Sequence, residues 1–126
     1  MKTRYAVALS MLAGIAIGAI AIQGLHAQAK PKAFVVTETE VLDAAALAAY
    51  SPLARAAADA AGARRVSPPG GKTVAFVGEA PKRVGIQEWE SLEKAQAFRN
   101  SDAFKNLTSQ RDKAVKTIRS YAVEAN

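Results

Sequence analysis

Cysteine is absent from this chain of 126 residues, and histidine occurs only once, at His26. Without cysteine the protein can form no disulfide, thiolate-bound zinc site, iron–sulfur cluster or thiol nucleophile. Because His26 lies in a segment that we expect to be removed, the remaining domain would lack histidine as well. Such a domain offers transition metals a poor ligand set and lacks the usual general base of neutral pH. We therefore expect no metal, no cofactor, no haem–histidine site and no Ser–His catalysis.

A dense run of basic residues is also missing, although the formal net charge is +6. Charges of both signs alternate along the chain, which is typical of a solvated protein surface. We therefore expect no nucleic-acid partner. The length allows a single domain.

The N-terminal segment has the layout of a secretory signal peptide. Lys2 and Arg4 precede an uncharged apolar run over residues 5–22, and a small-x-small exit site follows. We expect residues 1–29 to be cleaved and residues 30–126 to be exported to the bacterial periplasm or secreted, with only transient membrane contact. An uncleaved membrane anchor is the alternative, since the run is close to the shortest length that spans a bilayer. Its alanines and glycines dilute the hydrophobicity and favour cleavage.

The rest of the chain predicts an α+β domain. Residues 33–41 alternate between the two sides of a strand, and Asp43 can cap a helix over residues 44–61 that kinks or restarts at Pro52. The other expected elements are strands over 63–67, 73–78, 83–89 and 117–124 and a second helix that starts at Ser91 and restarts at Ser101. The order β-α-β-β-β-α-β corresponds to a ferredoxin-like split βαβ sandwich with one extra strand.

One face of this predicted sheet would remain uncovered. Two helices can cover one face, and few residues are left to cover the other, which still carries valine, isoleucine, phenylalanine and tyrosine. An exposed apolar face favours association, and pairing two sheets face to face would hide it. We therefore expect a homodimer.

The chain's only tryptophan, Trp89, lies where a strand passes into a helix. Ser91 can cap that helix, and the helix N-terminus favours the negative charge of Glu90, so neither residue requires an active site. We expect Trp89 to pack as an apolar anchor, with stacking on a ligand as the alternative.

Arg111 falls on an apolar helical stripe that also contains Phe104. A guanidinium on a core-facing stripe needs a partner, because an unpaired buried charge is costly. Two partners are open: an internal salt bridge to Glu88, or an anionic ligand in a cavity. Tyr50, on the apolar face of the first helix, can line the same cavity or pack in the core.

With these residues identified, the chain resembles a family of small bacterial proteins known as domain of unknown function 1330, over residues 32–125. The resemblance rests on the first strand with Asp43 and Tyr50, a glycine-rich turn, the block Arg83-Val84-Gly85-Ile86-Gln87-Glu88-Trp89-Glu90-Ser91, and then Ser101, Phe104 and Arg111. It implies a ferredoxin-like fold of the dimeric α+β barrel type, with two subunits joined through their sheets. Trp89 stands where the family usually has Phe, and Phe104 where it usually has Tyr. The resemblance implies no reaction.

Three functions follow as hypotheses. The first is an exported homodimer that binds a small, anionic or aromatic molecule between sheet and helices, with Arg111 supplying charge, Trp89 and Tyr50 the walls, and Glu88 orienting Arg111. The second is a cofactor-free monooxygenase or isomerase like relatives of the superfamily, with Glu88 as catalytic base and Arg111 stabilising an enolate. That reading requires Glu88 to face a cavity and to have a raised pKa. The third is a structural or protein-interaction module without a ligand.

Overall fold

The first strand, β1 (Ala33–Val41), lies inside an antiparallel sheet, and its alternating residues explain why. The computed structural model describes residues 30–125, so the predicted signal peptide lies outside the described residues. β1 pairs with β3 (Arg83–Trp89) on one side and with β4 (Val115–Glu124) on the other, and β2 (Arg64–Ser67) pairs with β3. The strand order β2-β3-β1-β4 confirms the predicted ferredoxin-like α+β fold.

The first helix, α2 (Ala44–Ala60), begins at the predicted residue and ends one residue before the predicted end at 61. The side chain of Asp43 accepts a hydrogen bond from the backbone nitrogen of Ala46 at 2.9 Å. Gly62 follows the helix with a φ of 102°, a conformation that glycine adopts without strain. The helix continues through Pro52, so the predicted restart does not occur, because alanine-rich residues on both sides favour helix strongly.

The second helical region is divided into short helices. The Ser91 hydroxyl accepts a hydrogen bond from the backbone nitrogen of Lys94 at 3.2 Å, and the Ser101 hydroxyl accepts one from Phe104 at 3.3 Å. The predicted restart at Ser101 is therefore confirmed. The helices are α3 (Leu92–Asn100), α4 (Asp102–Lys105) and α5 (Thr108–Ala114). Within residues 30–125, no helix combines the length and apolar character that a membrane crossing requires.

The strand predicted over residues 73–78 is wrong, because this segment is part of a loop between β2 and β3. β2 pairs directly with β3, whose other edge pairs with β1, so the loop finds no free edge of β3 to join. Its apolar residues stay on the surface, and Phe76 and Val77 are each 96 % exposed. The sheet therefore has four strands instead of the predicted five.

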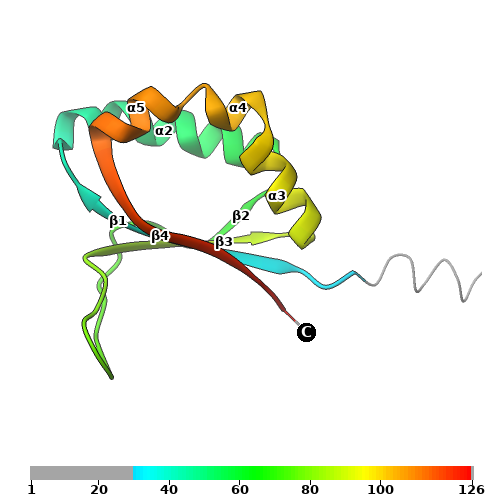
Figure 1. Cartoon of the computed structure of the whole chain (residues 1–126), viewed down its shortest axis with the longest axis horizontal. Coiled ribbons are helices and arrows are strands. Elements are labelled where there is room, and N and C mark those ends of the chain that lie inside the picture. Colours follow the sequence, from blue (N-terminus) through cyan, green and yellow to red (C-terminus); the bar gives the residue numbers. More distant parts are fainter. Residues whose placement is uncertain (1–29, 126) are drawn as a thin grey trace, which may run out of the picture. The chain divides into compact units, whose positions relative to one another are not determined.

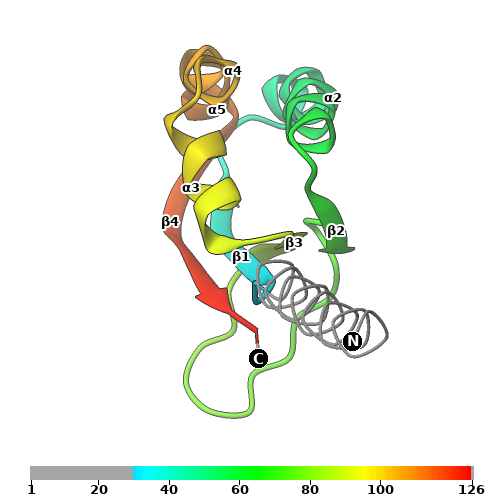
Figure 2. The same cartoon turned by 90° about the vertical axis from the view of Figure 1, so that its right-hand side faces the viewer.

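The helices lie on one side of the sheet and the loop between β2 and β3 extends to the other (Figure 1). We call the helix-covered side of the sheet the inner face and the opposite side the outer face. Figure 2 shows α3 close to the sheet, whereas α2 and the pair α4 and α5, seen nearly end-on, lie side by side above it. The buried core gathers near α3 and consists of Ala33, Val35, Ala58, Trp89, Ala95 and Phe98. Away from α3, helices and sheet are held further apart.

Candidate functional site

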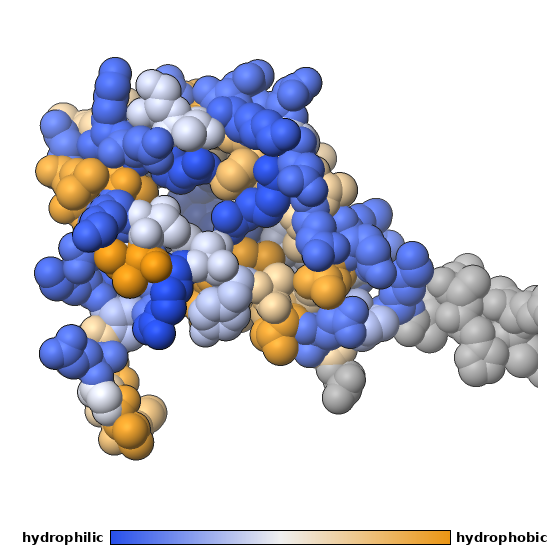
Figure 3. All heavy atoms as spheres, viewed as in Figure 1, coloured by the Kyte–Doolittle hydropathy of each residue, from blue (hydrophilic) through white to orange (hydrophobic). Residues whose placement is uncertain are grey.

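A cavity of about 540 Å³ lies between the inner face of the sheet and the helices. Its floor includes Thr37 and Thr39 of β1 and Gln87 of β3, and its roof includes Tyr50 of α2 and Phe104 of α4. Figure 3 shows the molecular surface hollowed between the helix layer and the sheet. The volume falls within the range typical of pockets for small organic molecules, about 300–1,000 Å³.

Arginine is the dominant charged residue of this cavity. Five arginines line it, each from a different element: Arg55, Arg65, Arg83, Arg99 and Arg111. Asp112 is the only carboxylate among the described lining residues, and its side chain is 70 % exposed. The cavity is therefore strongly positive, and its polar groups other than arginine are mainly hydroxyls.

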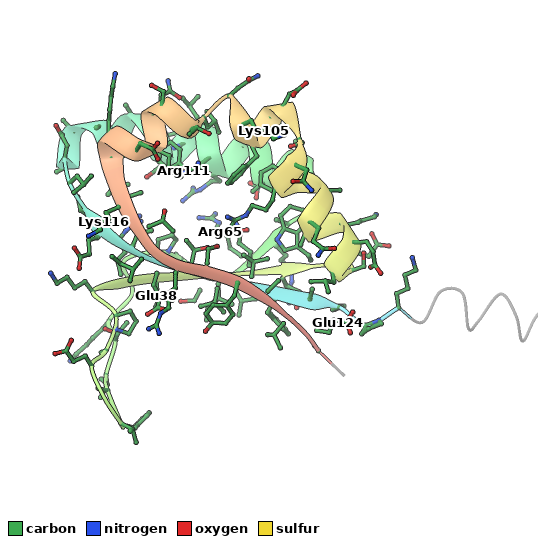
Figure 4. All side chains as sticks on the ribbon, viewed as in Figure 1. Glu38, Arg65, Lys105, Arg111, Lys116 and Glu124 are labelled. Atoms are coloured by element: carbon green, nitrogen blue, oxygen red, sulfur yellow. The ribbon has the colours of Figure 1, made fainter. Side chains whose placement is uncertain are left out.

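Arg111 extends from α5 into the space between helices and sheet (Figure 4). Its guanidinium carbon lies 4.5 Å from the centre of the Phe104 ring, and its side chain is 19 % exposed. One terminal nitrogen donates to the Thr108 hydroxyl at 3.3 Å, and Nε lies 3.9 Å from a carboxylate oxygen of Asp112. The other terminal nitrogen, Nη1, is buried without a hydrogen-bond partner in the described structure. Arg111 thus keeps an unused donor beside the cavity.

Arg99 reaches the same Phe104 ring from α3, with 4.8 Å between its guanidinium carbon and the ring centre. Its Nη2 donates to the hydroxyls of Ser120 at 2.7 Å and Thr37 at 3.3 Å. Burial lowers the pKa of Arg99, and the nearby positive charge of Arg111 lowers it further. Two guanidiniums therefore repel each other across one aromatic ring.

Arg83 enters the cavity from β3. Its Nη1 donates to the Thr39 hydroxyl at 3.2 Å, and no ion pair with a carboxylate is formed by it or by Arg99 in the described structure. Burial lowers the pKa of Arg83, and its interaction with Tyr50 partly opposes that shift. Tyr50 acts in the same direction on the pKa of Arg99, and all three residues line the cavity.

Glu88 lies on the outer face, away from the cavity. Alternation along β3 places Gln87 against the cavity and turns Glu88 to the other side. There its carboxylate accepts bonds from Arg64 Nη2 at 2.8 Å and Lys32 Nζ at 3.0 Å. The hydrogen bond from Arg64, followed by that from Lys32, lowers the pKa of Glu88. The predicted pairing of Glu88 with Arg111 is therefore wrong, and so is the raised pKa that a catalytic base requires.

Trp89 is part of the core and does not line the cavity. Its side chain packs against Phe98, with 5.1 Å between ring centres, and the residue is only 2 % exposed. Its indole nitrogen donates to the side-chain oxygen of Gln87 at 3.4 Å. The expected role of Trp89 as an apolar anchor is therefore confirmed, whereas its alternative role as a cavity wall belongs to Phe98 and Phe104.

The structure thus brings together two of the four predicted site residues, Tyr50 and Arg111, and separates them from Glu88 and Trp89. It adds Arg83 and Arg99, which sequence reasoning missed. The described residues contain no group of three or more histidine, cysteine or acidic side chains that could hold a metal ion.

Comparisons with known proteins identify relatives by fold and by family. A family model described as domain of unknown function (DUF1330) matches residues 32–126. The chain is similar to the crystal structure of RPA0582, a protein of unknown function from Rhodopseudomonas palustris, with a TM-score of 0.62 and 16 % identity over 85 % of this chain and 92 % of that one. The methylated form of RPA0582 gives a TM-score of 0.59 and 15 % identity over 85 % and 90 % of the two chains. No curated protein matches the sequence. The structural likeness, at such low identity, establishes the fold alone.

Proposed function

Since this chain belongs to the DUF1330 family, for which no function is established, we propose its role from the cavity itself: it binds a small organic anion between sheet and helices. The observation that carries the proposal is the group of arginines around a cavity whose described lining contains one carboxylate, which is exposed. A guanidinium out of water is costly unless charge or hydrogen bonds compensate it. A carboxylate or phosphate accepts two parallel bonds from arginine and would supply that compensation.

The remaining walls of the cavity favour an organic ligand over a simple inorganic ion. Leu47, Ala54 and Val115 are apolar, and Phe98 and Phe104 are aromatic. An anion with a hydrocarbon or aromatic body would bury that body against these side chains while its charge meets the arginines.

Small molecules that co-purify with the protein provide the direct test. We expect mass spectrometry of the wild-type protein to detect an organic anion that is depleted in Arg111→Gln. Arg119→Gln is the matched control, because Arg119 is the same residue type on the outer face, bonded to Glu38 at 2.7 Å. Thermal unfolding of both variants verifies that they fold. Retention of the same anion by Arg111→Gln, or its equal loss from both variants, would contradict the proposal.

No geometric observation favours catalysis by Glu88. The carboxylate is held by Arg64 and Lys32 on the outer face, where it cannot reach a molecule in the cavity. Asp112, the one carboxylate among the described residues that line the cavity, has a side chain that is 70 % exposed to solvent. We therefore propose binding without assigning a reaction.

A second part of the proposal is that two copies associate through the outer faces of their sheets. Support comes from apolar residues on that face, including Tyr121 and Val123, which are 53 % and 52 % exposed. Its carboxylates are already paired within the chain, Glu38 with Arg119 and Glu88 with Arg64, so two such faces can meet without unpaired acidic charge.

Light scattering of the eluting protein tests this association. We expect the mass of two chains for the wild type and of one chain for Tyr121→Glu, which places a charge on the outer face of the edge strand β4. Leu53→Glu is the control, since Leu53 is similarly exposed, at 45 %, but lies on α2. A wild-type mass of one chain, or a Tyr121→Glu variant that still elutes as two, would refute the outer-face dimer.

Export remains a proposal that concerns residues 1–29, outside the described part. If the segment is a cleaved signal peptide, the protein in the periplasmic fraction begins at Lys30, and N-terminal mass spectrometry measures this directly. A membrane-bound protein that retains Met1 would support the anchor instead.

A further inference from the structure

We infer that the ligand is an organic dianion: one anionic group lies among Arg83, Arg99 and Arg111, and a second lies beside Arg55 and Arg65. This inference rests on the proposed function, because it specifies the ligand of the same cavity. We call Arg83, Arg99 and Arg111 the inner arginines and Arg55 and Arg65 the entrance arginines.

The inner arginines converge on one place. Arg99 and Arg111 lie at 4.8 Å and 4.5 Å from the centre of the same Phe104 ring. Arg83 and Arg99 both interact electrostatically with Tyr50. Apart from the long contact between Arg111 and Asp112, their partners are hydroxyl groups, and Arg111 Nη1 has no partner in the described structure. One carboxylate or phosphate at this place would be contacted by more than one guanidinium and would relieve their mutual repulsion.

The entrance arginines form a second, separate positive group. Arg55 comes from α2 and Arg65 from β2, elements that Figure 2 shows one above the other at the same edge of the fold. Both side chains line the cavity, yet both residues are exposed, unlike the partly buried inner arginines. Neither forms an ion pair among the described residues.

Two consecutive arginines of β2, Arg64 and Arg65, show that, among the described residues, ion pairs are missing only on the cavity side of this strand. Arg64 is opposite Glu88 in the register and forms a 2.8 Å ion pair with it on the outer face. Arg65 is opposite Gln87, a cavity residue with a neutral side chain. Figure 4 shows Arg65 in the space below Arg111, between sheet and helices. Of these two consecutive arginines, Arg64 is paired with a carboxylate of the protein and Arg65, in the described structure, is not. Arg65 is therefore able to bind an anionic group of a ligand.

The two sets differ in exposure, and apolar residues such as Leu47, Ala54 and Ala58 of α2 line the cavity as well, so we infer two anionic groups and not one. The ligand chemistry that fits is two anionic groups separated by a hydrocarbon or aromatic spacer. A dicarboxylate and a carboxylated phosphate ester share this chemistry, and the choice of probes distinguishes them.

Calorimetric titration with matched probes tests the inference on the purified protein. The probes are benzoate, benzene-1,4-dicarboxylate and 4-carboxyphenyl phosphate, which share a ring and differ in the number and type of anionic groups. We expect at least one of the two probes that carry two anionic groups to bind about tenfold more tightly than benzoate at low salt, since each partly exposed charge contact contributes modestly. The tighter of these two probes identifies carboxylate or phosphate as the second group.

Substitution of the entrance arginines locates the second group. In Arg55→Gln/Arg65→Gln we expect the advantage of the dianion to disappear while benzoate affinity changes by less than about threefold. Arg64→Gln is the matched control on the same strand, and it should leave the advantage intact. All these residues are exposed, so the variants should fold.

Two other outcomes would contradict either the dianion inference or the proposed function. Equal affinity for benzoate and both dianions, or an advantage that persists in the entrance variant, overturns the dianion inference and leaves anion binding standing. Binding of no probe to the wild-type protein, together with no co-purifying anion, overturns the proposed function itself.

Discussion

Arginines on the two faces of the sheet have different partners, carboxylates on the outer face and hydroxyl groups on the inner face. On the outer face, the Arg119 side chain makes two bonds to Glu38, at 2.7 Å and 2.9 Å, and Arg64 makes two to Glu88, at 2.8 Å and 3.4 Å. On the inner face, Arg83 and Arg99 bond only to hydroxyls among the described residues. The protein therefore pairs these two outer arginines with carboxylates and bonds the two inner ones to neutral hydroxyls, and we propose that a ligand compensates the inner charges.

Packing on the inner face explains how the fold tolerates those charges. Near α3, Trp89 and Phe98 close the space between helices and sheet with a tight aromatic contact. Around the cavity, which Phe104 helps to line, the helices and the sheet are not packed against each other. We infer that stability is concentrated at the aromatic end and that the arginine end is set aside for binding.

The largest effect is expected from Trp89→Ala, which removes the anchor of the packed end. We expect the free energy of unfolding to fall by about 3–5 kcal/mol, the usual cost of truncating a buried aromatic side chain. Chemical denaturation measures the loss. Trp89→Phe keeps a ring against Phe98 and should cost clearly less, whereas a Trp89→Ala loss below about 1 kcal/mol would show that the anchor lies elsewhere.

A smaller effect of opposite sign is expected from Arg111→Met, at the arginine end. Methionine removes a guanidinium with a buried unpaired nitrogen and keeps much of its volume. The contact with Phe104 is lost, at a cost of about 0.5–1 kcal/mol. We therefore expect unfolding without ligand to be unchanged or stabilised by up to about 1 kcal/mol, while anion binding is lost.

Arg119→Met provides the comparison for that result. This substitution removes both bonds from Arg119 to the mostly buried Glu38 carboxylate on the outer face and should destabilise the protein. If Arg111→Met is instead the more destabilising of the two by denaturation, Arg111 is a structural residue and the contrast between the faces fails.

Local patterns in the sequence predicted most of the fold because they act over short distances. The alternation over residues 33–41 and the capping residues Asp43, Ser91 and Ser101 each depend on neighbours within a few positions. The strand predicted over residues 73–78 was wrong because a strand needs a pairing partner, and the neighbouring strand β3 pairs with β1 and β2 instead.

The site was less predictable, since it depends on which face each side chain takes. Arg111 and Tyr50 could be identified because both lie on apolar helical stripes. The alternation of β3 could also have shown that Glu88 and Trp89 lie on opposite faces of the sheet. By the same rule, Arg83 lies on the face of Gln87 and Trp89. Arg99 offered no such signal, because its contact with Phe104 arises only after α3 and α4 turn relative to each other.

The smallest effect concerns the pH dependence of the neutralised outer face. The hydrogen bond from Arg64, with that from Lys32, lowers the pKa of Glu88 below the value of about 4.3 expected in the unfolded chain. Between these two pKa values the unfolded state binds the proton more readily, so stability is fully present above the unfolded pKa and is lost as pH falls through the folded one. We expect the Tm of the wild type to drop more between about pH 6 and about pH 3 than that of Glu88→Gln, which has no carboxylate to titrate at that position.

Glu79→Gln is the control: it removes an exposed carboxylate of the loop and should retain the wild-type dependence of Tm on pH. If Tm falls equally with pH in the wild type and in Glu88→Gln, the Arg64–Glu88 ion pair contributes nothing measurable to stability. The ion pairs of the outer face would then have no energetic consequence.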